Sequence, residues 1–132
     1  MINVPKRSAS LITVLLFACS LAKSQESTID YTECIKKSSS SWGSKCSQCS
    51  NYENTYRVNL INICNDTVEV KVAVREKSNR WRIFFNKQLA PNDSISGYAC
   101  DGLGKYMFWA RKLCDNSIVM PTDDEVQKLS PQ

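Results

Sequence analysis

The sequence contains no histidine among its 132 residues. This excludes Ser-His-Asp and Cys-His nucleophilic systems, histidine metal sites and imidazole proton shuttles. A Gly-x-Ser-x-Gly elbow, a phosphate-binding loop and a dinucleotide fingerprint are also missing, and the acidic residues are scattered rather than paired as in glycoside hydrolases. We therefore expect no enzymatic activity, no cofactor and no metal.

The sequence also lacks a hydrophobic run long enough to span a bilayer. The apolar run 11–22 has 12 residues, whereas a spanning helix needs about 20. It follows Lys6 and Arg7, ends on the small residue Ala22 and is followed by the small residue Ser24. This order is typical of a secretory signal cleaved after Ser24, and the alternative is an N-terminal core helix. We expect an exported protein whose signal peptide is 1–24.

A second processing route competes with signal cleavage. The sequence Leu-Phe-Ala-Cys at 16–19 is similar to a bacterial lipobox, in which Cys19 would be acylated and would anchor the protein to the cell envelope. The expected location is therefore secreted or periplasmic, with a lipid anchor on the envelope as the alternative.

Once Cys19 is set aside, the seven cysteines leave an even set, which suits disulfides in an oxidising compartment. The candidates are Cys34, Cys46, Cys49, Cys64, Cys100 and Cys114. Sequence leaves their fifteen pairings open. The first expected bridge is Cys64–Cys100, at two predicted strand ends, with Cys114 bonded to one of the three N-terminal cysteines. Zinc bound by four thiolates is disfavoured, because only one Cys-x-x-Cys is present.

The net charge disfavours nucleic acid as a partner. The formal charge of +4 includes Lys6, Arg7 and Lys23, and their loss with the signal leaves +1. A nearly neutral chain is not attracted as a whole to phosphate backbones. A glycan or another protein remains as the expected partner.

The mature chain divides into three parts by composition. Segment 25–55 is a polar, cysteine-containing extension with a serine run at 38–41, segment 56–114 alternates like β-strands, and 115–132 is a polar tail. A short helix over 32–37 is an open alternative within the extension. We expect an all-β fold, a small antiparallel sandwich or partial barrel of about five strands, stabilised by disulfides because its core is small.

Alternation with a period of two locates the strands. The valines at 68, 70, 72 and 74 give the clearest pattern, and Trp81, Ile83 and Phe85 give the next. The first strand begins at Tyr56, and a change of phase towards Ile61 and Ile63 suggests a bulge. Two further strands are expected over 94–100 and 105–113.

The outward positions of these strands form a candidate basic ligand surface. Its members are Lys71, Arg75, Arg80, Arg82, Trp109 and Arg111. A tryptophan beside arginines could stack on a sugar ring or hold an acidic group. Basic side chains on a strand also protect it against edge pairing, so the surface has a purely structural explanation. The sequence does not decide which face of the last strand is buried.

Three further features carry functional hypotheses. The pair Cys46 and Cys49 has the spacing of a thiol-disulfide oxidoreductase, which is the alternative to a binding module. A secreted inhibitor of a hydrolase is another alternative, and it would need a protruding loop such as 101–104. Asn65 and Asn92 begin glycosylation sequons in predicted turns.

Residues 63–111 resemble a family of small exported or membrane-anchored bacterial domains of unknown function. The matching residues are Cys64, Asn65, Thr67, Val70, Val72, Ala73, Trp81, Leu89, Ala90, Pro91, Tyr106 and Ala110. A glycine commonly follows the proline in that family, whereas Asn92 stands there in this sequence. The resemblance implies a β domain outside the cytoplasm and a bacterial source, and it implies no activity.

Overall fold

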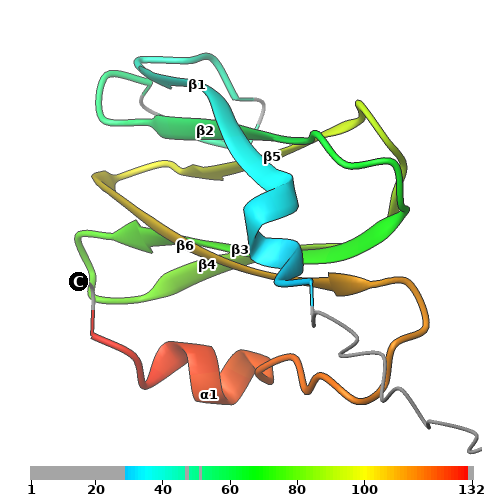
Figure 1. Ribbon diagram of the computed structural model, residues 1–132. Coiled ribbons are helices and arrows are strands. Elements are labelled where there is room, and N and C mark those ends of the chain that lie inside the picture. Colours follow the sequence, from blue (N-terminus) through cyan, green and yellow to red (C-terminus); the bar gives the residue numbers. More distant parts are fainter. Residues whose placement is uncertain (1–28, 47, 51, 131–132) are drawn as a thin grey trace, which may run out of the picture.

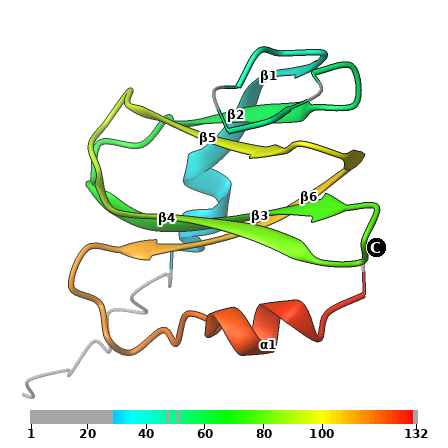
Figure 2. The same ribbon diagram turned by 180° about the vertical axis from the view of Figure 1, so that it is seen from behind.

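The computed structural model describes residues 29–46, 48–50 and 52–130, and it shows two antiparallel sheets packed face to face (Figures 1 and 2). The first sheet has the order β1 (Ile35–Trp42), β2 (Tyr56–Asn62) and β5 (Ser94–Ala99). The second has the order β4 (Trp81–Leu89), β3 (Val68–Glu76) and β6 (Gly102–Lys112). The expected all-β sandwich with disulfides is therefore confirmed.

Strand β1 is the element that the alternation pattern missed. It lies in the segment assigned to a polar extension, and only Ile35 among its residues is buried. Its backbone pairs with β2 from Ile35 opposite Asn62 to Trp42 opposite Tyr56. A strand held mainly by its hydrogen-bond ladder needs no hydrophobic alternation. The short helix η1 (Tyr31–Cys34) precedes it.

The main core lies between the two sheets. The four alternating valines of β3 are fully buried there with Val58 and Leu60 of β2 and Leu89 of β4. Strand β2 alternates through its whole length and ends on buried Asn62, while Ile63 is exposed. The predicted bulge in this strand is therefore wrong, and the register shifts occur in β1 and at both ends of β3.

The C-terminal segment forms a third layer. Helix α1 (Asp123–Gln127) lies beneath the outer face of the second sheet (Figures 1 and 2). A capping box between Thr122 and Glu125 begins this helix, and Val126 packs with Ala73 and Trp81 in a second core. Since both faces of β3 are covered, its outward residues are buried as well as its valines. Residues 123–127 of the expected polar tail thus cover the outer face of the second sheet.

The last strand, β6, resolves the question of which face is buried. Its residues Tyr106, Phe108 and Ala110 pack against the main core, while Met107 and Trp109 pack against the second core. Both sets are thus covered by protein, because one faces the other sheet and the other faces the C-terminal layer.

Gln127 attaches this third layer to the edge strand β4. Its Oε1 accepts from the backbone N–H of Trp81 at 2.9 Å, and its Nε2 donates to the carbonyl of Trp81 at 2.7 Å. We expect Gln127→Ala to lower the free energy of unfolding by about 1–2 kcal/mol, because both groups of Trp81 lose their partner. Urea denaturation measures this, with Gln88→Ala, on an exposed position of the same strand, as the control. Equal midpoints for the two variants would contradict the attachment.

Candidate functional site

The structure describes two disulfides, one at each end of the first sheet. Cys34 bonds Cys64 with Cα atoms 5.1 Å apart, and Cys49 bonds Cys100 with Cα atoms 5.2 Å apart. Cys46 is free and buried, and Cys114 is free and exposed. The expected Cys64–Cys100 bridge and a bridge from Cys114 are therefore wrong. Because β5 runs antiparallel to β2, Cys100 lies where β2 begins and Cys64 lies where it ends.

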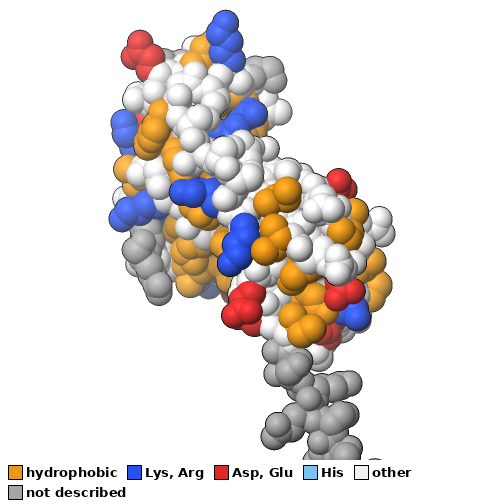
Figure 3. Space-filling view, turned by 45° about the horizontal axis from the view of Figure 1, so that its top comes forward, with side chains coloured by type: hydrophobic (Ala, Val, Ile, Leu, Met, Phe, Trp, Pro, Cys, Tyr) orange, Lys and Arg blue, Asp and Glu red, His pale blue; other side chains and the backbone are white. Residues whose placement is uncertain are grey.

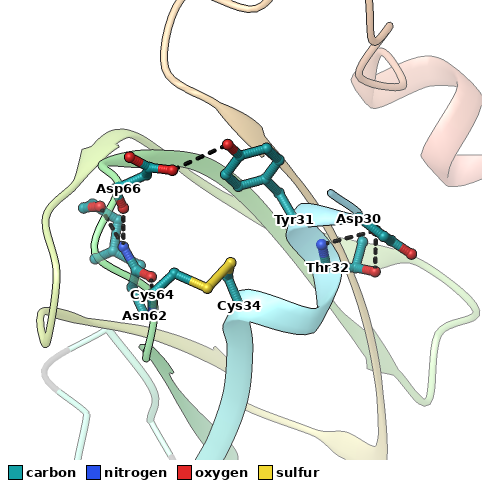
Figure 4. Close-up of a disulfide and its surroundings, with 8 residues drawn as sticks. Asp30, Tyr31, Thr32, Cys34, Asn62, Cys64 and Asp66 are labelled. Atoms are coloured by element: carbon teal, nitrogen blue, oxygen red, sulfur yellow. Dashed lines mark hydrogen bonds between the residues drawn. A yellow bond between two sulfur atoms is a disulfide. The ribbon is translucent and has the colours of Figure 1, made fainter. Parts of the chain in front are cut away.

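A polar network surrounds the Cys34–Cys64 bridge (Figure 4). The Nδ2 of Asn62 donates to the carbonyls of Asp66 at 2.8 Å and Leu89 at 3.1 Å, and its Oδ1 accepts from the N–H of Cys64 at 3.0 Å. The hydroxyl of Tyr31 donates to Oδ2 of Asp66 at 3.1 Å. Burial, together with this carboxylate, raises the pKa of Tyr31. These bonds tie η1, the end of β2 and the end of β4 to the loop after β2, which gives this end of the sheet a structural role.

The other end of the first sheet, at the Cys49–Cys100 bridge, brings together cysteines, arginines and a tyrosine. The carbonyl of Cys46 accepts from the N–H of Cys49 at 3.0 Å, which places both cysteines in one turn. Nη1 of Arg82, on β4, lies 3.3 Å from Sγ of Cys100. The hydroxyl of Tyr98, on β5, donates to Oε1 of Gln48 at 2.9 Å. The β1–β2 turn is thereby joined to residues from both sheets.

Cys46 carries the free thiol of this cluster. The backbone N–H of Gln48 lowers the pKa of its thiol, and the hydroxyl of Tyr98 and the charges of Arg57 and Arg82 act in the same direction against the effect of burial. The thiol in turn raises the pKa of Tyr98. A thiol with a lowered pKa is a nucleophile towards disulfides. The sequence identified Cys46 and Cys49 as a pair, but in the structure Cys49 is bonded to Cys100.

The lowered pKa of Cys46 predicts how the alkylation of its thiol depends on pH. We expect Arg82→Gln to raise the pKa of Cys46 and so to move the pH midpoint of its alkylation by iodoacetamide upward, because a stabilising cation is removed. The background is Cys114→Ser, which removes the exposed thiol. Arg80→Gln is the matched control, since Arg80 is exposed and does not act on this thiol. Identical pH profiles for the two variants would exclude this role of Arg82.

The loop 101–104, proposed as a protruding inhibitory loop, is packed down. The N–H of Gly102 donates to the carbonyl of Asn54 at 2.9 Å, and a Cβ on Gly102 would lie 2.6 Å from Cβ of Tyr56. Gly104, with φ of 74°, lies against the ring of Trp42. The expected protrusion is thus wrong. A depression of about 290 Å³ lies beside this loop, lined by Ser50, Asn54, Cys100 and Asp101.

The predicted basic ligand surface is not one surface in the structure. Lys71 is buried, pairs with Asp123 at 2.9 Å and donates to the carbonyl of Pro121. Arg75 is buried with its guanidinium 4.9 Å from the ring of Trp81. The C-terminal segment covers Lys71, and Trp81 packs over Arg75, so the expectation that both face solvent is wrong.

The other members of that predicted surface lie apart. Arg111 pairs with Glu69, and Trp109 belongs to the second core, so neither is an open stacking platform. Arg82 turns towards the ring of Tyr98, 4.8 Å away, and Arg80 is exposed on the turn before β4.

The remaining sequence hypotheses have these outcomes. Asn65 and Asn92 are exposed in turns, and their glycosylation stays a prediction. The signal and Cys19 lie outside the described residues. No helix in the described part of the chain is long and apolar enough to cross a membrane. Nor do those residues contain a group of three or more side chains placed to hold a metal ion.

Strand β1 presents an open edge next to exposed aromatic side chains. Among the described strands it pairs only with β2, and every residue from Lys36 to Trp42 is exposed. Trp42 is 55% exposed, and its ring packs against that of Tyr56 with centroids 5.0 Å apart and planes tilted by 50°. In Figure 3, which turns the β1 side forward, hydrophobic side chains are interspersed with basic ones and uncharged surface.

Comparison with known proteins gives one finding. The family model described as "Legumain, prodomain" matches residues 10–79, which is more than half of the chain. Within the described residues the match includes η1, β1, β2 and β3. This match does not support the bacterial family suggested for residues 63–111. No curated protein and no solved structure gives a significant match.

Proposed function

The chain belongs to the legumain prodomain family, and from this we propose that it is an exported inhibitory module that binds a peptidase. The family match is the observation that carries the proposal. A prodomain acts by contact with a peptidase, so the partner is a protein rather than a glycan. The chain itself is assigned no catalytic activity.

The two disulfides support an exported location. Such bonds persist in oxidising compartments and are rare in the cytosol. The bridges join segments 30 and 51 residues apart in sequence, so they hold the N-terminal part of the chain on the sheets. A module that must survive next to a peptidase gains from such cross-links, because they suppress local unfolding and with it cleavage.

The β1 edge supports docking of a protein segment. It lies within the residues that match the prodomain family. An unpaired strand edge can take a further strand from a partner, with backbone hydrogen bonds supplying affinity. Serines make up four of the eight residues of β1, and its only charged residues are Lys36 and Lys37. Few charges therefore oppose an added strand.

Three exposed apolar side chains provide anchors beside this edge. Trp42 lies over Gly104, whose neighbour Leu103 is 41% exposed. Tyr52 is 39% exposed, and its carbonyl lies 3.9 Å from a Cβ built on Gly43, the residue after Trp42. Aromatic side chains that are partly exposed before binding are typical hot spots of protein interfaces. We assign the docking surface to the β1 edge together with Trp42, Tyr52 and Leu103.

The proposal is tested by adding the purified protein to legumain that lacks its own prodomain. We expect peptidase activity on a small peptide substrate to fall with increasing protein concentration, to saturate, and to return on dilution. We also expect the two proteins to elute together in size-exclusion chromatography. Unchanged activity and separate elution would refute the proposal.

Replacing Trp42 with alanine tests the assigned surface. We expect the inhibition constant to rise by about 30-fold, the effect of removing an interface hot spot worth about 2 kcal/mol. Val119→Ala is the matched control, because Val119 is an apolar residue 86% exposed on the C-terminal segment. Equal inhibition constants for the two variants, with unchanged melting temperatures, would place the docking surface elsewhere.

A further inference from the structure

Three cysteines meet where β5 ends, and only two of them are bonded to each other. Cys49 is bonded to Cys100, while Cys46, on the same turn as Cys49, keeps a free thiol and is 7% exposed. We propose that these residues form a thiol–disulfide exchange site, in which the bond moves from Cys49–Cys100 to Cys46–Cys100. This inference does not depend on peptidase binding.

Gln48 links the free thiol to the disulfide. Its backbone N–H bonds the thiol of Cys46, and its carbonyl oxygen lies 3.8 Å from Sγ of Cys100. Its side chain accepts from Tyr98, whose hydroxyl also bonds the thiol of Cys46. Gln48 therefore contacts both the sulfur that attacks and the sulfur that is attacked.

The charges around these sulfurs favour the exchange. Arg82 contacts Sγ of Cys100 at 3.3 Å and acts on the thiol of Cys46, and Arg57 acts on this thiol from β2. Both are cations, so they stabilise the thiolate that attacks. Arg82 also pairs with Glu76 at 3.7 Å, which holds its guanidinium in place.

The step balances without an added oxidant or reductant. Cys46 loses its proton to water, and its thiolate attacks Sγ of Cys100. The Cys46–Cys100 bond forms as the Cys49–Cys100 bond breaks, and the electron pair passes to Sγ of Cys49, which takes up a proton from water. One thiol and one disulfide exist before and after. The covalent attachment of the β1–β2 loop to Cys100 thereby moves from Cys49 to Cys46, three residues closer to β1. Cys100 lines the depression together with Ser50 and Asn54.

Peptide mapping without reduction tests the exchange. The Cys114→Ser protein is held folded at pH 8, quenched with acid, denatured and labelled with N-ethylmaleimide. Trypsin cleaves after Lys45 and Arg57, so one peptide carries both Cys46 and Cys49, and tandem mass spectrometry must locate the label within it. We expect a measurable share of the label on Cys49, in peptides whose Cys46 is bonded to Cys100. Label confined to Cys46 would overturn the proposal.

Two variants control this experiment. Cys46→Ser removes the attacking thiol, so we expect the label on Cys49 to disappear; labelled Cys49 in this variant would attribute the signal to scrambling and overturn the proposal. Cys49→Ser removes the present partner, so we expect a Cys46–Cys100 bond after oxidative folding. Cys46 and Cys100 both recovered as free thiols in that variant would also overturn it.

Discussion

Replacing Asn62 with leucine is expected to lower the free energy of unfolding by about 3–4 kcal/mol. Asn62 is fully buried at the end of β2, and its side chain satisfies two carbonyls and one N–H. Leucine has the same branching at Cγ but leaves these groups buried without partners, at about 1–3 kcal/mol each before relaxation and water entry reduce the sum. Urea denaturation followed by tryptophan fluorescence measures the change.

Asn59→Leu is the control for this substitution. Asn59 lies on the same strand, three residues earlier, and its side chain bonds Ser39 and Ser96 on exposed surface. Water replaces those bonds, so we expect a change below about 1 kcal/mol. Equal losses in the two variants would show that the buried network of Asn62 has no special part in stability.

Removing the Cys34–Cys64 bridge is expected to lower the free energy of unfolding by about as much as Asn62→Leu does. The bond closes a loop with a sequence separation of 30, for which chain entropy predicts about 3–4 kcal/mol. The variant is Cys34→Ala with Cys64→Ala, and the measurement is the urea midpoint of the folded protein. We also expect faster proteolysis before β1, because η1 loses its covalent attachment to the end of β2.

Cys114→Ala is the matched control for the double variant, because Cys114 is free and exposed. We expect its midpoint to equal that of the unchanged protein. If the double variant also kept that midpoint, the bridge would be absent or energetically neutral.

Most of the second sheet could be predicted from the sequence. The valines of β3 alternate strictly because one face of this strand meets the main core. Strand β1 could not be found in this way, because its side chains face solvent and its partner is a backbone. The C-terminal layer also escaped, since Val126 is the single buried side chain of α1.

The candidate site could be predicted in its parts but not in its arrangement. Composition and spacing identified the cysteines and the Cys46–Cys49 pair. Which cysteines meet depends on strand pairing, and the antiparallel β2–β5 ladder places Cys100 beside the β1–β2 loop. Tyr98 and Gln48 carry no sequence signal for this role, because their effect on Cys46 exists only after the sheets have formed.

Hydrogen exchange on the mixture with prodomain-free legumain tests most directly whether the β1 edge receives a peptidase. We predict slower exchange of backbone amides from Ile35 to Trp42 and around Leu103 when the peptidase is present. Amides of α1 lie on the far side of the second sheet, and their exchange should not change (Figure 1). Protection of α1 with no change in β1 would contradict the account, as would identical exchange with and without the peptidase.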